Sequence, residues 1–155
     1  MKVEYINPFI EASLEVISQT TNMKPTIGKV FVKNNSYNGD GVVIFIGLTG
    51  KINGNVVLSL SKNLALNIAS AMMGGMPVIE LDEISKSAIA ELANMILGNT
   101  ASIFYKNGIG IDITPPTVLT GENINLTPTK SVTVCIPLNF QGGESLEIDV
   151  SYQKN

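Results

Sequence analysis

The feature that most constrains this chain is a helical repeat of apolar residues from Glu83 to about Lys106. Apolar side chains recur there on one side of the predicted helix, at Ile89, Leu92, Ile96 and Ile103. A helix with such a stripe is stable in water only when the stripe is buried against the rest of the protein. We therefore expect one long helix whose apolar side faces the core and whose opposite side faces solvent.

The solvent side of this helix has an unusual composition. At roughly 100° per residue, Ser87, Glu91, Asn94 and Gly98 fall within about 60° of one another. Their neighbours are small, where an ordinary exposed face carries Lys, Glu and Arg: Ala90, Ala93 and Ala101. Small neighbours let another surface come close, and a carboxylate and a carboxamide three residues apart point the same way from adjacent turns. The two side chains could therefore engage one target together.

Each of these four residues also has a plainer interpretation. Glu91 could be an ordinary solvated helix residue, whereas Asn94 is unfavourable in an exposed helix by several tenths of a kcal/mol relative to Ala, so its position asks for a reason. Ser87 could orient Glu91, or its small side chain could merely leave room for another surface on this side of the helix. Gly98 costs roughly 1 kcal/mol relative to Ala in a helix interior, which favours close approach by a partner or by a packed helix.

Composition narrows the possible functions. The chain has 155 residues, 45% of them hydrophobic and 15% charged, which predicts a single globular domain over residues 1–155. A net charge of -3 and ten basic residues scattered singly argue against binding nucleic acid. The longest apolar runs, such as Val42 to Leu48, are too short to cross a bilayer, and the N-terminus lacks a signal-peptide layout. We expect a cytoplasmic protein that does not contact the membrane.

The residue inventory excludes several kinds of catalysis. The chain has no histidine, so a Ser-His-Asp triad and the usual zinc sites are absent, and a bound metal would need carboxylates alone. The local acidic residues Glu80, Asp82 and Glu83 lie where a helix N-terminus favours negative charge, so we interpret them as capping residues. Cys135 lies in an alternating apolar segment and is expected to be a buried structural thiol. No metal site is predicted.

The first half of the chain predicts a helix followed by strands. Asn7 and Pro8 suit a helix start, the helix is expected to end near Asn22, and Ile10, Leu14 and Ile17 would form its inner stripe. Three strands are expected after it, separated by Asn and Gly clusters such as Gly39-Asp-Gly41 that indicate turns: Ile27–Lys33, Val42–Leu48 and Gly54–Leu60. The second strand is nearly all apolar and is therefore expected to be central.

The second half predicts two helices and a hairpin. Ser61 is expected to cap a helix that runs to Met73 and stops at Gly74-Gly75, and Asp82 to cap the long helix, which Gly108 ends. After an extended Pro115-Pro116 segment, two alternating segments flank Gln141-Gly-Gly143 as in a hairpin: Val132–Phe140 and Ser145–Tyr152. Together these elements predict an α+β fold in which helices cover a largely antiparallel sheet.

Four segments carry a resemblance to a known family. They are Tyr5-Ile-Asn-Pro-Phe-Ile-Glu11, Gly50-Lys-Ile-Asn-Gly-Asn-Val56, Met72-Met-Gly-Gly75 and Glu91-Leu-Ala-Asn-Met-Ile-Leu-Gly-Asn99. With the same order of elements, they resemble the CheX branch of the CheC/CheX/FliY chemotaxis phosphatases over nearly the whole chain. Ser87-x3-Glu91-x2-Asn94 matches the family pattern of Asp or Ser, three residues, Glu, two residues, Asn. The resemblance implies a CheC-like fold and an enzyme that dephosphorylates the phosphoaspartate of a CheY-type response regulator.

The resemblance also implies a role for each matched residue. Asn94 would enter the regulator's site and hold the attacking water in line with the phosphorus, and Glu91 would pair with a lysine of the regulator. Ser87 and Gly98 would lie in the partner-binding surface. The enzyme would need no cofactor of its own, since the regulator would supply Mg²⁺. Phosphoryl transfer depends chiefly on positioning and electrostatic stabilisation, so two side chains without a histidine can suffice.

The sequence also bears on the branch of the family. CheC-type members carry a second Glu/Asn pair on the first helix, but here the equivalent spacing from Glu11 reaches Leu14, and from Glu15 it reaches Ser18. One site per chain is therefore expected, and by resemblance a homodimer. Two other classes stay open: a non-catalytic flagellar-switch-like module that docks a response regulator, and a small-ligand or sensory domain in which the stripe is incidental.

Overall fold

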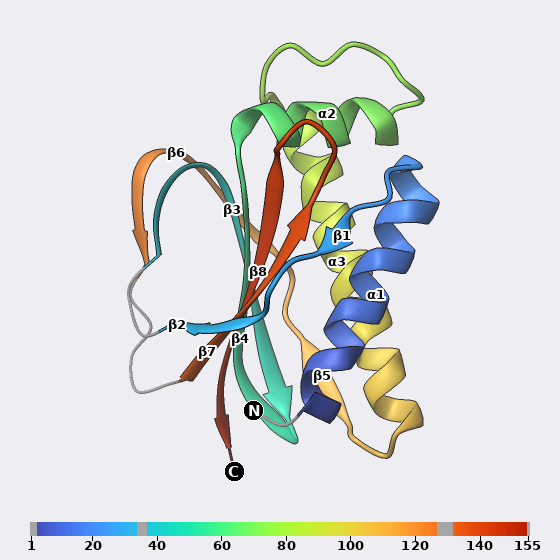
Figure 1. Cartoon of the computed structure of the whole chain (residues 1–155), viewed down its shortest axis with the longest axis vertical. Helices are drawn as coiled ribbons and strands as arrows, with labels where there is room; N and C mark the ends of the chain where they lie inside the picture. Colours follow the sequence, from blue (N-terminus) through green and yellow to red (C-terminus); the bar gives the residue numbers. More distant parts are fainter. Residues whose placement is uncertain (1–2, 34–36, 127–131, 155) are drawn as a thin grey trace.

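The computed structural model describes residues 3–33, 37–126 and 132–154, and it shows one curved sheet with helices on one side (Figure 1). The helices are α1 (Val3–Thr21), α2 (Lys62–Met72) and α3 (Glu83–Lys106). The strands are β1 (Thr26–Ile27), β2 (Phe31–Lys33), β3 (Tyr37–Gly50), β4 (Ile52–Leu60), β5 (Ile111–Ile113), β6 (Thr117–Leu126), β7 (Val132–Asn139) and β8 (Ser145–Lys154). No helix in these described ranges is long and apolar enough to span a membrane.

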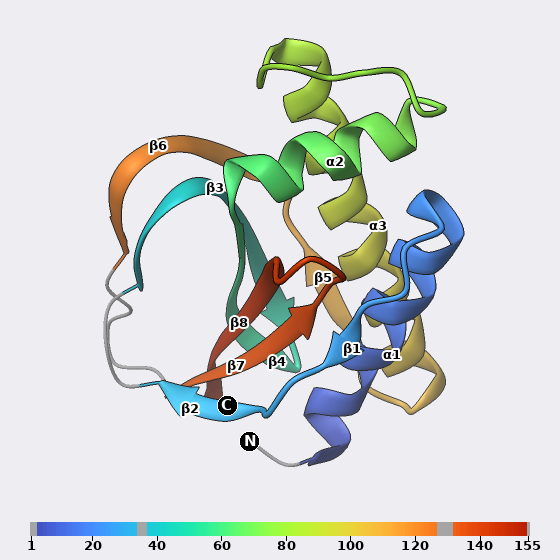
Figure 2. The ribbon, with the colours of Figure 1, turned by 45° about the horizontal axis from the view of Figure 1, so that its top comes forward.

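The sheet is antiparallel at every described pairing, which confirms the expected α+β class. The strand order is β1-β7-β8-β4-β3-β5, with β2 also paired to β7 and β6 to β3. Because β2 and β6 extend the two sides, the sheet curls around on the side away from the helices (Figure 2). The apolar β3 has partners on both of its sides, as the sequence predicted for the central strand.

The helices and the sheet share one core because the strands alternate. Val56 lies opposite Val150 and Leu58 opposite Ile148 across the β4/β8 pairing, and all four side chains are buried in that core. Helices α1 and α3 run side by side over this face and meet through aromatic rings (Figure 1). Phe104 packs edge-on against Phe9 at a centroid distance of 5.7 Å, which ties the C-terminal part of α3 to the N-terminal part of α1.

The predicted start of the first helix is wrong. The helix already includes Val3, and Pro8 lies inside it rather than in its first turn. A proline near a helix start removes only one backbone hydrogen bond, and burial of Pro8 and Phe9 against the core offsets that loss. The expected inner stripe does face the core, since Ile17 is buried there and the partly buried Ile10 and Leu14 pack against it.

Two strand predictions also need correction. The segment Ile27–Lys33 is not one strand, because β1 and β2 are separate short strands that both pair with β7. The expected turn at Gly39-Asp-Gly41 lies within β3, where the register to β6 shifts between Gly39 and Gly41. Gly41 has a φ of 122°, and a Cβ there would lie 2.5 Å from the Leu60 carbonyl oxygen, so only glycine fits this irregularity.

The predicted ends of α2 and α3 are confirmed. Ser61 caps α2 by accepting a hydrogen bond from the Leu64 amide at 3.1 Å, and Asp82 caps α3 by accepting one from the Ser85 amide at 2.8 Å. Gly108 follows α3 with a φ of 80°, the left-handed conformation that commonly ends a helix. The bounds of α3 agree with the predicted range of Glu83 to Lys106.

Candidate functional site

The candidate site lies on α3, which the core holds from behind. Ile89, Leu92 and Ile96 are each at most 2% exposed, as the apolar stripe predicts, while Ile103 is only partly buried. The N-terminal end of the helix is fixed by Asp82, whose pKa is held below its usual range because its carboxylate accepts hydrogen bonds from Ser85. The outward stripe, which consists of Ser87, Glu91, Asn94 and Gly98, is therefore held in place by a helix that packs firmly on the core.

The outward stripe differs in exposure from residue to residue. Ser87 and Glu91 are exposed, whereas Asn94 is half-buried, so the expectation that both Glu91 and Asn94 are substantially exposed holds fully only for Glu91. Across the described residues, the side chains of Glu91 and Asn94 make no hydrogen bond or ion pair within the protein. Both polar groups therefore remain available to an external partner.

A groove brings three of the predicted residues together with a segment that the sequence analysis missed. One wall consists of Ser87, Ala90, Glu91 and Asn94 from α3, and the other of Ile113, Thr114, Pro115 and Pro116. The second wall is fixed to the sheet, since Gly47 and Thr114 exchange two hydrogen bonds of 2.8 and 3.0 Å. The Pro115-Pro116 pair was predicted only to be extended, because nothing local shows which helix it lies beside.

Gly98 continues the stripe beyond the groove. A Cβ built on Gly98 would meet no atom within 4 Å, so no neighbouring element of the protein requires glycine there. This finding removes the packed-helix interpretation of Gly98. Close approach by an external partner stays a prediction.

Near the start of α1, Glu4 and Asn7 are both exposed and lie three residues apart, which is the spacing of Glu91 and Asn94. Glu11 and Glu15 are exposed on α1, and the positions three residues after them hold the partly buried Leu14 and Ser18. Neither of these two positions supplies a carboxamide, whereas Asn7 does, so one site per chain stays a prediction.

Cys135 is buried, as predicted, and burial raises the pKa of its thiol, which favours the neutral form. Its surroundings differ from the expectation, because Glu147 and Asp149 place carboxylate oxygens near its sulfur. Without histidine, the sequence indicated that a metal would need carboxylates alone. The hairpin register places Cys135 opposite Asp149, so the thiol and two carboxylates share one face of the sheet.

The chain is similar to known proteins along most of its length. Residues 42–139 match the family described as chemotaxis phosphatase CheX. The chain belongs to the CheX family. A Thermotoga maritima relative named CheY-P phosphatase CheX is 34% identical over 151 residues, or 97% of either chain.

Solved CheX structures share the fold throughout. A CheX protein from Desulfovibrio desulfuricans has a TM-score of 0.88 and 27% identity, covering 97% of this chain and 100% of its own. A Borrelia burgdorferi CheX was solved as a CheX-CheY-BeF3-Mg²⁺ complex; it has a TM-score of 0.85 and 24% identity, covering 99% of this chain and 100% of its own. The latter likeness establishes the fold alone.

Proposed function

We propose that this CheX-family protein dephosphorylates the phosphoaspartate of a CheY-type response regulator. The observation that carries the proposal is the pair Glu91 and Asn94, which lie one turn apart on α3, line one groove and have no partner among the described residues. Ser87 occupies the preceding turn of the same wall. Three polar positions at the spacing of the family pattern thus share one accessible surface.

The proposed reaction needs little beyond positioning. The oxygen of a water molecule attacks the phosphorus, the bond from phosphorus to the aspartate oxygen breaks, and the products are aspartate and inorganic phosphate. An acyl phosphate is already activated, so placing the water in line supplies much of the catalysis. The Asn94 carboxamide oxygen can accept a hydrogen bond from that water, and partial burial of Asn94 restricts its rotamers.

Glu91 acts as the anchor in this proposal. Its exposed carboxylate can pair with a lysine of the regulator, and the pairing sets how deeply α3 enters the regulator's site. Pro115 and Pro116 form a stiff opposite wall that limits how the regulator can tilt. Mg²⁺ belongs to the regulator, where it neutralises charge on the phosphoryl group.

Three further parts of the proposal concern the whole chain: residues 1–155 form one phosphatase domain, each chain carries one site, and two chains form a homodimer. Light scattering tests the last point, with a mass of twice 16.5 kDa expected. A monomer at all accessible concentrations would contradict it.

The non-catalytic alternative is a module that docks the regulator without hydrolysing it. Glu91 and the groove would serve such a module equally well, but docking gives no reason for a half-buried carboxamide in the middle of an exposed helix face. Asn94 therefore favours the enzyme.

Incubation with a phosphorylated CheY-type regulator and measurement of released phosphate separate the two functions. An enzyme releases phosphate with multiple turnovers at substoichiometric amounts. Binding to the phosphorylated regulator without faster release would establish the docking module instead.

A further inference from the structure

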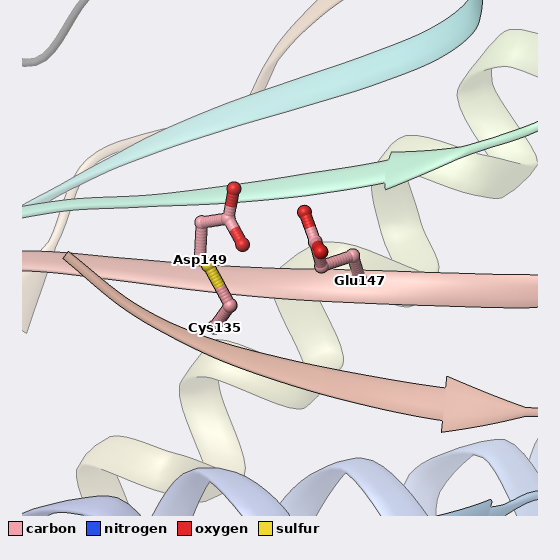
Figure 3. A group of neighbouring side chains, drawn as sticks. All are labelled: Cys135, Glu147 and Asp149. Atoms are coloured by element: carbon pink, nitrogen blue, oxygen red, sulfur yellow. The ribbon is translucent and has the colours of Figure 1, made fainter. Parts of the chain in front are cut away.

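We propose that Cys135, Glu147 and Asp149 form a binding site for a divalent cation of borderline softness, of which Zn²⁺ is the best fit. The three side chains come from β7 and β8 and lie together on the face of the sheet away from the helices (Figure 3). The site is separate from the groove on α3 and does not depend on the proposed phosphatase activity.

The geometry brings three ligand atoms together. One ligand atom from each residue, the Cys135 sulfur and a carboxylate oxygen from Glu147 and Asp149, lie within 4.8 Å of one another. Cys135 is fully buried and Asp149 is 4% exposed. Strand alternation fixes this arrangement, because Glu147 and Asp149 are two residues apart on β8 and Asp149 pairs with Cys135 across the hairpin.

A second observation points to a ligand between these side chains. Among the described residues, Asp149 Oδ1 is a buried side-chain oxygen with no hydrogen-bond partner. An unpaired carboxylate oxygen in the interior is costly, since burial removes its water without replacing it. A cation bound between the three residues would satisfy this oxygen.

Lys33 currently supplies part of the compensating charge. Its Nζ lies 3.4 Å from Glu147 Oε2 and 3.5 Å from Asp149 Oδ2. Both distances are long for a charge-assisted hydrogen bond, and the single charge cannot neutralise two carboxylates. Lys33 and a divalent cation would therefore compete for the same carboxylates.

The ligand set selects the class of cation. Thiolate favours softer ions, whereas Mg²⁺ and Ca²⁺ prefer all-oxygen sites, and Zn²⁺ accepts one sulfur and two carboxylate oxygens. Three protein ligands would leave the fourth tetrahedral position for water. The Glu147 side chain, 24% exposed, provides the path from solvent.

Binding must displace protons. Burial raises the pKa of both Cys135 and Glu147, and the neighbouring Asp149 raises each further. Metal ligands must be deprotonated, so cation binding releases protons and strengthens as the pH rises.

Co²⁺ and Zn²⁺ titrations of the full chain test the proposal, because Co²⁺ bound to thiolate gives a charge-transfer absorption in the near ultraviolet. We expect one equivalent of Co²⁺ to produce this band, Zn²⁺ to abolish it, and Cys135→Ser to lack it. Asp149→Asn should weaken Zn²⁺ binding by at least about tenfold, since even changes around metal ligands commonly cost that much. Glu15→Gln and Asp112→Asn are matched exposed controls and should bind as wild type.

Lys33→Met gives an independent test with the opposite sign. Removing the competing ammonium should tighten Zn²⁺ binding, provided that circular dichroism shows a folded chain. Absence of stoichiometric binding in the wild-type protein, or an unchanged Co²⁺ spectrum in Cys135→Ser, would overturn the proposal. Weaker binding in folded Lys33→Met would overturn the placement of the cation between the carboxylates.

Discussion

Glu91 and Asn94 are only one turn apart, yet the fold gives them different surroundings. Glu91 is exposed and free to follow a partner, whereas Asn94 is half-buried beside the Pro115-Pro116 wall. A mobile charged side chain suits binding of the regulator, and a carboxamide with restricted rotamers suits positioning of the attacking water. The local environments thus support the assignment of anchor to Glu91 and water positioning to Asn94.

Replacing Glu91 tests the anchor. Glu91→Gln removes one partner of a charge-assisted pair, which contributes about 1.5–3 kcal/mol, so KM for the phosphorylated regulator should rise about 10- to 100-fold. The turnover rate kcat should change much less. Steady-state phosphate release gives both constants, and Glu83→Gln, exposed at the helix start, is the matched control. An unchanged KM would remove Glu91 from the interface.

At the scale of elements, α3 depends on its N-cap. The Asp82 carboxylate accepts hydrogen bonds from the backbone and side chain of Ser85, and these lower its pKa. A carboxyl whose pKa is lower in the folded state stabilises the protein above its unfolded pKa, and this stabilisation is lost as the pH falls through the folded pKa. The cap therefore contributes at neutral pH and fades in strong acid.

Asp82→Ala should lower the Tm at pH 7, and the difference from wild type should shrink as the pH falls below about 4, where the unfolded carboxyl is protonated. Asp82→Asn keeps an acceptor and should cost less than Asp82→Ala. Thermal denaturation followed by circular dichroism measures both differences. A Tm difference that grows in acid would contradict this account of the cap.

Replacing Gly98 tests whether the outward side of α3 needs a residue without a side chain at this position. Gly98→Ala should stabilise the protein by about 1 kcal/mol, because alanine favours helix and its Cβ meets no atom within 4 Å. The same methyl group should weaken binding of the regulator if the partner approaches closely. Asn99→Ala, also exposed on α3 but on another side, is the control for helix propensity. A higher free energy of unfolding with unchanged affinity for the regulator would show that the regulator does not approach Gly98 closely.

The elements that could be predicted from sequence have local signals. Asp82 and Gly108 mark both ends of α3, and Gln141-Gly-Gly143 marks the β7/β8 hairpin; the structure confirms each. Strand β6 was missed because Gly121 and Asn123 interrupt it with positive φ values, which is a turn signal rather than a strand signal. Its pairing with β3 is a long-range contact that no local pattern records.

The same distinction holds for the candidate site. The α3 wall follows from helical spacing, so Ser87, Glu91 and Asn94 could be found from sequence. The Pro115-Pro116 wall depends on β5 pairing with β3, which brings distant segments together. The Cys135 cluster likewise depends on hairpin register, and it was missed when each residue was considered alone.

On the scale of the whole molecule, the sheet separates two surfaces. Helices α1 and α3 cover one face, and α3 turns the candidate phosphatase site outward from it (Figure 1). The opposite face carries Lys33, Glu147 and Asp149 within the curl of the sheet. Variants on one face should therefore leave the chemistry of the other unchanged.

The proposed origin of Mg²⁺ gives a prediction for the isolated protein. Mg²⁺ demands octahedral oxygen coordination, and Glu91 stands on α3 without a second carboxylate in its groove, so calorimetric titration of Mg²⁺ should show no stoichiometric binding. Binding of the protein to a BeF3-loaded regulator should nevertheless require Mg²⁺. A tight Mg²⁺ site that Glu91→Gln abolishes would change Glu91 from anchor to metal ligand.

The most direct test of the phosphatase proposal is multiple-turnover phosphate release by wild-type protein and Asn94→Ala, with Asn67→Ala on the exposed side of α2 as control. Loss of the positioned water should lower kcat by at least about 100-fold, while the free energy of unfolding changes by less than about 1 kcal/mol. Affinity for the BeF3-loaded regulator should remain close to that of wild type. Wild-type turnover by folded Asn94→Ala would contradict the central claim.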